Sequence, residues 1–526
     1  MPAATFELLV AMIAYMAVVI GIGLFFAKRA QANSENYFLG GRSLGPWVAA
    51  MSAEASDMSG WLLMGLPGLA YWSGIADATW TAIGLAVGTY VNWRIVARRL
   101  RRYSAVSGDA ITVPDFLSNR YHEKNKVILT VSALFILVFF TVYAGSCFVT
   151  VGKLFSTLFN MPYHSMMIAG ALFVVVYTFI GGFLAESASD FMQGTVMFIA
   201  LLSILTLGTI AAGGIAAVVS NAEQIPGFFS FFTTAVPMVS DAGVQQASAG
   251  TPLFGPAQGY GVLAIISTLS WGLGYFGVPQ VLLRFMAIRK EEELVKSRRI
   301  ATVWCAISLV AAVSIGVIGR VLFPVDPTLA TASGAENVFV VLAQHLLPTV
   351  LAGVIMAGIL AATISSSDSY LLIAASAFSK NIYEGVFKRG QADDRVVMRV
   401  SRIVLLLVAL VGVVIAWDEH SIIFTLVAFA WAGFGATFGP VMLCSLFWKR
   451  TTRAGAIAGM VAGGVSVFAW RLLLSPLGGV FGIYELMPAF LISLVVISIV
   501  SLATQEPSTQ IQKEFDRAAS GEVSGS

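Results

Sequence analysis

Basic residues are missing from a long central part of this chain. Of its 31 Lys and Arg residues, none lies within 154–283. Charged residues make up only 11% of the sequence, against roughly 25% in ordinary soluble domains. Hydrophobic residues account for 58%, and the mean hydropathy is +0.84. These values exclude a soluble single-core protein and predict an all-α polytopic membrane protein, because basic residues are kept on the cytoplasmic side of membranes.

Cysteine and histidine are also scarce. Cys147, Cys305 and Cys444 all lie in apolar stretches, and the four histidines show no ligand spacing. This pattern argues against a disulfide framework or a metal cluster. No nucleophile motif or phosphate-binding loop is present, so we expect neither an enzyme nor a resident cofactor. The net charge of +3 comes from basic residues spread along membrane flanks, so we expect no nucleic-acid partner and no obligate protein partner.

About thirteen apolar stretches approach the roughly 20 residues needed to cross a bilayer. They are 5–27, 48–72, 74–96, 127–158, 164–186, 190–217, 259–283, 299–323, 348–378, 400–417, 421–447, 454–474 and 483–504. The first lacks the basic leading region and cleavage site of a signal peptide, so we expect a retained helix.

Basic residues follow every second apolar stretch. They are Lys28, Arg29 and Arg42, then the clusters within 94–126 and 284–299, then Arg389, Arg395, Arg399, Lys449, Arg450, Arg453, Lys513 and Arg517. This alternation predicts an N-terminus outside and a cytoplasmic C-terminus. Lys153, Arg320 and Arg471 are the exceptions, which we expect near outer helix ends.

Two segments depart from the apolar pattern. Residues 218–258 contain four prolines among small polar residues, which predicts a long external loop. Residues 505–526 are polar, and we expect a cytoplasmic tail without ordered structure. Residues 1–504 are expected to form a single transmembrane domain.

The stretch 48–72 carries polar residues that a lipid-facing helix avoids. Glu54 and Asp57 lie near its middle, with three serines and a glycine around them. An acid inside a span indicates a functional site that faces a cation or an aqueous cavity. The alternative is a structural hydrogen-bonding role. We favour the functional interpretation for Asp57 and keep both open for Glu54.

The stretch 259–283 contains three glycines and Pro279 within 272–279. This composition predicts a broken helix, which is tolerated at membrane depth only where it lines a cavity. The alternative is that the glycines allow close helix packing. The i, i+4, i+8 spacing of Trp271, Tyr275 and Pro279 places them on one face.

The stretch 48–72 also departs from the rule that a span keeps its backbone hydrogen bonds throughout, so we expect it to be unwound. The two discontinuous stretches lie five spans apart. Each therefore opens one five-helix repeat, 48–217 and 259–447, and an odd number of helices turns the second repeat upside down.

The stretch 348–378 contains a run rich in hydroxyl groups. Ala362, Ser365 and Ser366 stand at i, i+3 and i+4, so one carbonyl and two hydroxyls converge on one face. Oxygen ligands of this kind suit an alkali cation. The alternative is that these hydroxyls bond their own helix backbone or mediate span packing.

At these residues the chain resembles the sodium/solute symporter family, and its proline-transporting branch in particular. The motifs that carry the resemblance are 52–61, 177–182, 271–279, 359–366 and 430–435. The resemblance covers nearly all spans. It implies a LeuT-like core of two inverted five-helix repeats, with one additional N-terminal and two additional C-terminal helices, in the inner membrane of a bacterium.

The resemblance also implies a sodium site between the stretches 48–72 and 348–378. Its ligands would be the carbonyls of Ala55, Met58 and Ala362 and the hydroxyls of Ser365 and Ser366. Ser366 stands where the family often has threonine. Asp57 resembles a residue required for sodium-dependent transport, and Asp190 an acid that influences ion coupling on the cytoplasmic side.

The substrate residues implied by the resemblance gather around aromatic side chains. They are Ser59, Gly60 and Trp61, where the sodium and substrate sites adjoin, and Tyr143, Trp271, Tyr275 and Pro279. Aromatic faces suit a compact pyrrolidinium ring, and the terminus of a half-helix suits its carboxylate.

The function implied is import of L-proline driven by sodium through alternating access. One alternative is the same fold carrying pantothenate, a sugar acid or another amino acid. Another is a transporter-like sensor, although relatives of that type usually append a signalling domain and the tail here is short.

Overall fold

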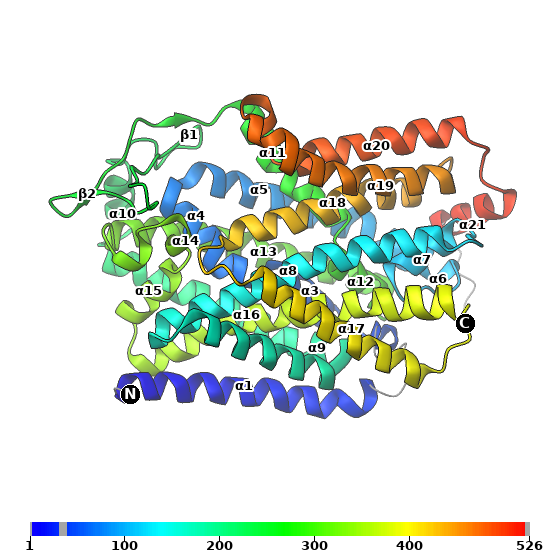
Figure 1. Cartoon of the computed structure of the whole chain (residues 1–526), viewed down its shortest axis with the longest axis horizontal. Coiled ribbons are helices and arrows are strands. Elements are labelled where there is room, and N and C mark those ends of the chain that lie inside the picture. Colours follow the sequence, from blue (N-terminus) through cyan, green and yellow to red (C-terminus); the bar gives the residue numbers. More distant parts are fainter. Residues whose placement is uncertain (1–2, 31–38, 521–526) are drawn as a thin grey trace.

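Long helices dominate the molecule and run roughly side by side (Figure 1). The computed structural model describes residues 3–30 and 39–520. Residues 1–2, 31–38 and 521–526 lie outside it, as do the side chains of Lys28 and Arg29 and the last part of the predicted tail.

The main elements, in chain order, are α1 Ala3–Ala30, α3 Pro46–Gly60, α4 Leu66–Ser73, α5 Ile75–Val91, α6 Ala97–Val106, α7 Val113–Arg120, α8 Val127–Phe159, α9 Tyr163–Ala211, α10 Ile215–Ala222, β1 Thr233–Thr234, β2 Ala247–Ser248, β3 Thr251–Pro252, β4 Gln258–Gly259, α11 Val262–Leu269, α12 Pro279–Ala287, α13 Leu294–Leu322, α14 Ala332–Ala335, α15 Val338–Leu346, α16 Thr349–Ser376, α17 Asp394–Ile415, α18 Ile423–Phe447, α19 Arg453–Ala469, α20 Leu486–Ala503 and α21 Thr509–Ser520.

Apolar helices of membrane-spanning length recur along the chain. Among the described residues, eight helices are long and apolar enough to span, or nine if the bent pair Val262–Phe276 and Pro279–Ala287 counts as one. The remaining predicted spans fall on shorter or interrupted helices. The protein is thus a multi-pass membrane protein, while the number thirteen and the inverted repeat stay predictions.

The element α9 covers the two spans predicted at 164–186 and 190–217. A straight helix of its 49 residues would measure about 73 Å, at 1.5 Å per residue. However, Tyr163 donates a hydrogen bond to Ala416 O at 2.8 Å, and Gly208 packs beside Ile318 and Leu346. All three partners lie at the same end of the bundle, so the chain turns back within α9 and crosses twice.

The two ends of the bundle differ in chemistry. The end that carries α6, α7 and α21 is here called the basic end, and the end that carries residues 212–261 the loop end (Figure 1). Arg42 donates to Met286 O at 2.7 Å, and Arg102 pairs with Glu291, both at the basic end. The basic clusters therefore meet at one end of the bundle, as the alternation in the sequence predicts.

The three exceptions lie at the loop end. Lys153 donates to Ser421 O at 2.7 Å, and Arg320 donates to Gln245 Oε1 at 3.0 Å. Arg471 lines a cavity beside the long loop. The helix α1 begins at the loop end and α20 finishes at the basic end (Figure 1).

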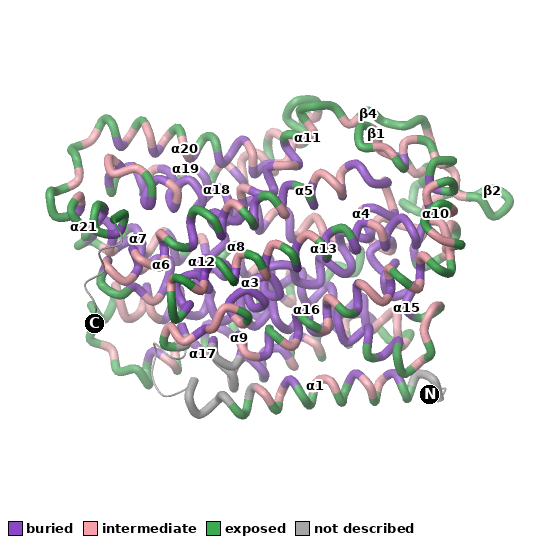
Figure 2. The backbone as a smooth tube through the Cα atoms, turned by 180° about the vertical axis from the view of Figure 1, so that it is seen from behind, coloured by how far each residue is buried: buried purple, intermediate pink, exposed green. Residues whose placement is uncertain are grey.

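The fraction of buried residues distinguishes the central helices from the outer ones (Figure 2). In the most apolar 18-residue windows of α16 and α18, 78% and 83% of residues are buried, against 33% in α17 and α20. The outer helices instead expose apolar side chains, such as Leu406, Leu410 and Val414 of α17. A membrane supplies the apolar solvent that these faces require.

The all-α prediction misses two small sheets in the external loop. Strand β1 pairs with β4, and β2 with β3, each as an antiparallel pair of two residues. Phe228 anchors this segment, because its side chain is buried and its carbonyl accepts a hydrogen bond from Ile75 N at 2.9 Å.

The expectation of an unstructured tail is wrong for residues 509–520. They form the amphipathic helix α21, which buries Ile511, Phe515 and Ala518. The guanidinium of Arg99 lies 4.7 Å from the ring centroid of Phe515. Apolar residues at helical spacing, hidden in a polar composition, account for the error.

Candidate functional site

The helix α3 breaks at Ser59, in the middle of the molecule. Ser59 has φ 49° and ψ −168°, a conformation that costs a non-glycine residue of the order of 1–3 kcal/mol. All residues of α3 from Ala49 to Gly60 are buried. Trp61 N donates to Ser59 Oγ at 3.2 Å, which caps part of the break. The discontinuity predicted for 48–72 is confirmed.

Three consecutive carbonyls before the break face neighbouring helices. Ser366 Oγ of α16 donates to Ala55 O at 3.3 Å, and Tyr370 Oη, also of α16, donates to Ser56 O at 2.8 Å. Tyr143 Oη of α8 donates to Asp57 O at 3.1 Å. Backbone oxygens of α3 are therefore presented to hydroxyl groups in the buried centre.

Asp57 links the break in α3 to the second broken span. Tyr275 Oη donates to Asp57 Oδ2 at 2.7 Å, while Asp57 Oδ1 is buried without a hydrogen-bond partner. A buried carboxylate oxygen without a donor is costly unless something else satisfies it. This oxygen is free to accept a further donor or a cation.

The second discontinuity, predicted within 259–283, is also confirmed. Residues Ser270–Phe276 form a 3₁₀ helix, and the following helix α12 is inclined by 41° to Val262–Phe276. Trp271 and Tyr275 both pack against the ring of Trp431, at centroid distances of 6.2 and 5.0 Å. Pro279 lies beyond the bend, so the i, i+8 spacing of a straight α-helix does not apply to it. Pro279 instead begins α12 and lines a small cavity with Thr112 and Asn381.

Aromatic rings cover the break in α3 on its loop-end side. The Trp271 ring centroid lies 5.5 Å from that of Trp61, 5.4 Å from Phe424 and 5.1 Å from Tyr484. Trp61 also stacks on Phe424 at 5.8 Å. We call Trp61, Trp271, Phe424 and Tyr484 the aromatic layer.

The hydroxyl-rich part of α16 faces α3. Ser365 and Ser366 are completely buried. Ser366 Oγ reaches Ala55 O, and Ser365 Oγ has no hydrogen-bond partner. Ala362 and Met58 are buried in the same pair of helices. Buried oxygens with unused lone pairs are the chemistry that a hard cation requires.

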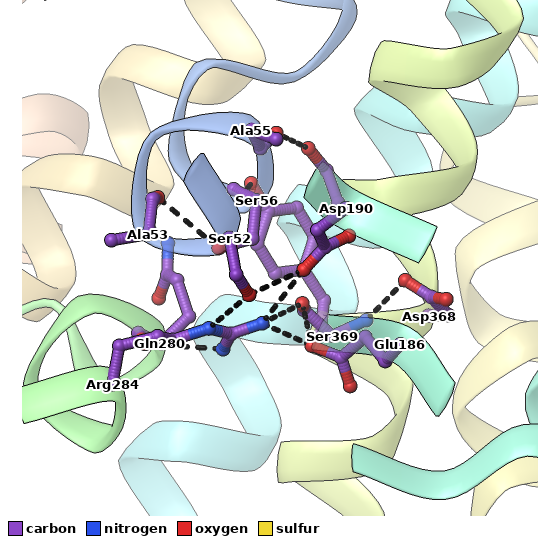
Figure 3. Close-up of polar contacts among 12 residues, drawn as sticks. Ser52, Ala53, Ala55, Ser56, Glu186, Asp190, Gln280, Arg284, Asp368 and Ser369 are labelled. Carbon is purple, nitrogen blue, oxygen red and sulfur yellow. Dashed lines mark hydrogen bonds and ion pairs between the residues drawn. The ribbon is translucent and has the colours of Figure 1, made fainter. Parts of the chain in front are cut away.

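A buried charged cluster surrounds Arg284 of α12 (Figure 3). The guanidinium donates through Nε to Ser52 Oγ at 3.0 Å and through Nη2 to Asp190 Oδ2 at 3.3 Å and Ser369 Oγ at 3.0 Å. It also pairs with Glu186. The side chains of Arg284 and Asp190 have no exposed surface. We call Arg284, Glu186, Asp190, Ser52 and Ser369 the Arg284 cluster.

The Arg284 cluster joins four elements. Ser52 belongs to α3, Glu186 and Asp190 to α9, Arg284 to α12 and Ser369 to α16. Through Ser52 the cluster contacts α3 before the break at Ser59, whereas Trp61 of the aromatic layer follows the break.

Comparison with known proteins identifies the family. The model of the sodium:solute symporter family matches residues 37–463. The chain belongs to this family. The symporter is also 38% identical to the sodium/proline symporter of Staphylococcus aureus (strain USA300), over 96% of this chain and 94% of that relative.

Solved structures share the fold of the symporter. A Na⁺-coupled sialic acid symporter in a substrate-bound outward-open state superposes with a TM-score of 0.75 at 18% identity, covering 95% of this chain and 99% of that one. A nucleobase-cation-symport-1 family transporter in a closed conformation gives a TM-score of 0.51 at 13% identity, covering 92% and 99%. The overall arrangement of helices is thus that of sodium-coupled and cation-coupled transporters.

The symporter brings most of the predicted site residues together. Ala55 and Ser366 share a hydrogen bond, and Tyr275 joins Asp57. Gly60 lies against Thr150, where a Cβ would come within 2.4 Å of Thr150 Cγ2. Asp190 lies in the Arg284 cluster.

Arg284 is the main residue that the sequence interpretation placed wrongly. The alternation of basic residues predicts that it follows the span, within the cluster 284–299, but it lies inside α12 with no exposed side-chain surface. The apolar residues on both sides of it, 281–283 and 285–287, are the signal that indicates burial. Tyr370 and Phe424 were also missed, because nothing in the local sequence distinguishes them from packing residues.

Proposed function

We propose that the symporter imports L-proline together with sodium by alternating access. The observation that carries this proposal is the break at Ser59, where carbonyls of α3 face hydroxyls of α16 at 2.8–3.3 Å. The name of the 38% identical relative supports proline as the solute. The protein acts as a transporter and not as an enzyme.

Sodium would bridge α3 and α16. Its proposed ligands are the carbonyls of Ala55, Met58 and Ala362 and the hydroxyls of Ser365 and Ser366. Asp57 would hold the broken segment in place through Tyr275, with its free Oδ1 available to the ion or the solute. Sodium binding would thereby order α3 and raise solute affinity, and the coupling must be reciprocal.

Proline would bind beside the break, below the aromatic layer. Trp271, Tyr275 and Tyr143 offer rings and hydroxyls there, and Ser59, Gly60 and Trp61 offer the backbone of the break. An aromatic face attracts the ring nitrogen cation. Backbone N–H groups at the start of a half-helix suit the carboxylate.

The Arg284 cluster would close the cytoplasmic side. We assign the basic end to the cytoplasm and the loop end to the exterior of a bacterial inner membrane, because basic residues are retained inside. Asp190 would then couple the ion site to this closure through Ser52 of α3.

Uptake of labelled L-proline into proteoliposomes tests the proposal. We expect accumulation with an inward sodium gradient and none with matched potassium. Ser366→Ala and Asp57→Asn should raise the sodium concentration for half-maximal uptake at least tenfold, while Ser156→Ala, which removes a hydroxyl near the loop end of α8, should not. Unchanged sodium activation in both variants would contradict the assigned ion site.

Another solute is the second candidate, because the sialic acid symporter shares the fold at a TM-score of 0.75. Competition by unlabelled pantothenate, sugar acids and other amino acids separates it from the first. If sodium drives uptake of one of these solutes and unlabelled proline does not reduce that uptake, the protein is a sodium symporter for a substrate other than proline.

A further inference from the structure

A groove opens between α8 and α17 on the outer surface of the bundle. Its volume is about 470 Å³, and every residue that lines it is apolar except Thr141. In its lining Val404 and Val408 are buried, whereas Ile403 and Leu407 are 58% and 56% exposed. The groove therefore opens on the surface of α17 that faces the hydrocarbon of the membrane.

The packing of the helices defines where the groove ends. Toward the loop end α8 and α17 are in close contact, because a Cβ on Gly412 would come within 2.9 Å of Phe148 Cε2 and 3.5 Å of Gly145 N. Nearer the basic end the π-helical segment Ala377–Phe387, which continues α16, packs against both helices and contributes Phe378 to the groove. The groove is thus a closed slot at one end and open at the other.

The length of the groove matches one leaflet of a bilayer. Its residues on α17 run from Val400 to Val411, which corresponds to about 17 Å at 1.5 Å per residue. The hydrocarbon core of a bilayer is roughly 30 Å thick. Since α17 ends at the loop end, where Ala416 O accepts a hydrogen bond from Tyr163, the groove lies in the leaflet of the basic end. It has the length and the apolar lining that one lipid acyl chain requires.

A row of arginines precedes the groove on α17. Arg395, Arg399 and Arg402 stand at i, i+4 and i+7, so they share one face of the helix. Arg399 lies one turn before Ile403 of the groove. The side chains of the three arginines form no hydrogen bond or ion pair with any residue that the structure describes, and Arg402 Nε is buried without a partner.

The carboxylates near this row are engaged elsewhere. Asp393 Oδ1 accepts a hydrogen bond from Arg395 N at 2.7 Å and so caps the helix. Glu384 pairs with the lysine one turn before it at 2.7 Å. Arginines in other parts of the basic end have a protein partner, as Arg42 has in Asp109 at 2.8 Å. The row on α17 thus retains its capacity to bind an anion.

The two features together favour one class of ligand. A guanidinium pairs well with a phosphate, and basic sites between membrane helices on the cytoplasmic side suit the headgroups of anionic lipids. A free phosphate would leave the apolar groove unfilled. A second copy of the chain, packed α17 against α17 about a two-fold axis, would bring two rows of arginines together. An anionic lipid satisfies the arginines and the groove at once.

We propose that this groove is a binding site for an anionic phospholipid, with its phosphate between Arg399 and Arg402 and one acyl chain between α8 and α17. The two arginines stand at i and i+3, so both reach the same phosphate. The acyl chain contacts Phe378 and fills the space that separates the helices. The site is independent of which solute the symporter carries.

Native mass spectrometry and thermal unfolding of the purified full chain in detergent test the site. The probes are dioleoylphosphatidylglycerol and dioleoylphosphatidylcholine, which have the same chains and differ in net charge. We expect at least tenfold higher affinity for phosphatidylglycerol, and a higher unfolding temperature in its presence. The double variant Arg399→Gln, Arg402→Gln should bind phosphatidylglycerol at least tenfold more weakly. Glycerol 3-phosphate, which lacks the acyl chains, should also bind at least tenfold more weakly.

A matched control separates the site from a general effect of charge. Arg298→Gln with Arg299→Gln removes two positive charges near the start of α13, outside the groove lining, and should bind phosphatidylglycerol as the wild type does. The position of the acyl chain is tested with a phosphatidylglycerol that carries a diazirine in the middle of one chain. After irradiation we expect label on residues 400–411 or 137–141, and less label when unlabelled phosphatidylglycerol is added.

Several outcomes would overturn the lipid site. They are equal affinity for the two lipids, wild-type affinity in the double variant, label outside the groove, or glycerol 3-phosphate binding as tightly as the lipid. Crosslinks that join α17 of two copies in the absence of lipid would assign the groove to a second copy of the chain. If the double variant does not fold, Arg399→Gln alone and the photolabel on the wild type decide.

Discussion

The aromatic layer and the Arg284 cluster lie on opposite sides of the break in α3, and different kinds of contact hold them together. The aromatic layer packs rings at centroid distances of 5.1–5.8 Å beneath a cavity of about 780 Å³. The Arg284 cluster joins four elements through charged hydrogen bonds in a region without exposed surface.

The two groups of residues differ in how their stability responds to the loss of one contact. Ring contacts are numerous and weakly directional, so the loss of one leaves the others in place. A buried guanidinium instead satisfies several carboxylate and hydroxyl oxygens at once, and its removal leaves them uncompensated. We therefore expect that loss of one ring weakens the aromatic layer only in part, whereas loss of the guanidinium disrupts the whole Arg284 cluster.

The largest effect is expected from Arg284→Gln. The change leaves Glu186 and Asp190 buried without their cation, and breaking a buried pair in this way costs about 3–5 kcal/mol. We expect a lower unfolding temperature and loss of proline uptake, measured on purified protein and in proteoliposomes.

Arg289→Gln is the control for this prediction. It makes the same change in an arginine whose side chain is 54% exposed and pairs with Glu293. We expect its unfolding temperature and proline uptake to stay close to those of the wild type. Normal stability and uptake in Arg284→Gln would show that the charged network is dispensable.

Gly60→Ala tests the packing at the break in α3, between the aromatic layer and the Arg284 cluster. The new Cβ would lie 2.4 Å from Thr150 Cγ2, and overpacking of this kind costs about 1–3 kcal/mol. We expect reduced thermal stability and reduced uptake, and partial recovery when Thr150→Ser removes the methyl group. Gly482→Ala, where no atom lies within 4 Å of the new Cβ, should be neutral. Equal stability of both alanine variants would contradict the close contact.

Trp271→Ala tests the aromatic layer. Aromatic pairs contribute about 0.5–1.5 kcal/mol each beyond area burial, so we expect proline affinity to fall about tenfold, equivalent to about 1.4 kcal/mol, in equilibrium binding with sodium. Trp80→Ala removes a tryptophan that packs on Phe231 outside the layer and should leave affinity unchanged. Wild-type affinity in Trp271→Ala would place the solute elsewhere.

The smallest effect is expected from Tyr143→Phe. It removes the hydrogen bond to Asp57 O, and a neutral hydrogen bond contributes about 0.5–1.5 kcal/mol. We expect the KM for proline to rise a few-fold. Tyr163→Phe, which removes the bond to Ala416 O at the loop end, should not change KM. If Tyr143→Phe weakens the interaction with proline more than Trp271→Ala does, the hydrogen bond of Tyr143 contributes more than the ring of Trp271.

The breaks within 48–72 and 259–283 could be predicted from the sequence, because each stretch contains residues that an ordinary membrane-spanning helix avoids. Glu54 and Asp57 stand where a lipid-facing helix excludes charge, and the glycines near Trp271 weaken a helix. The exact form of each break was not readable. A single residue, Ser59, interrupts α3, whereas a whole 3₁₀ segment, Ser270–Phe276, interrupts the other span.

The buried position of Arg284 could not be predicted from the sequence in the same way. A basic residue after an apolar stretch suits a cytoplasmic loop as well as a buried ion pair. Glu186 and Asp190 are 98 and 94 residues away from it in sequence, and local pattern carries no information on such pairs.

The sequence by itself determined the membrane character, the basic end and the places where helices break. These follow from hydropathy, the retention of basic residues and backbone sterics, all of which act along the chain. Only the tertiary structure decided which carbonyls meet which hydroxyls, which acids meet Arg284, and which rings form the aromatic layer. Those contacts join segments far apart in the sequence, and packing of the whole bundle sets their distances.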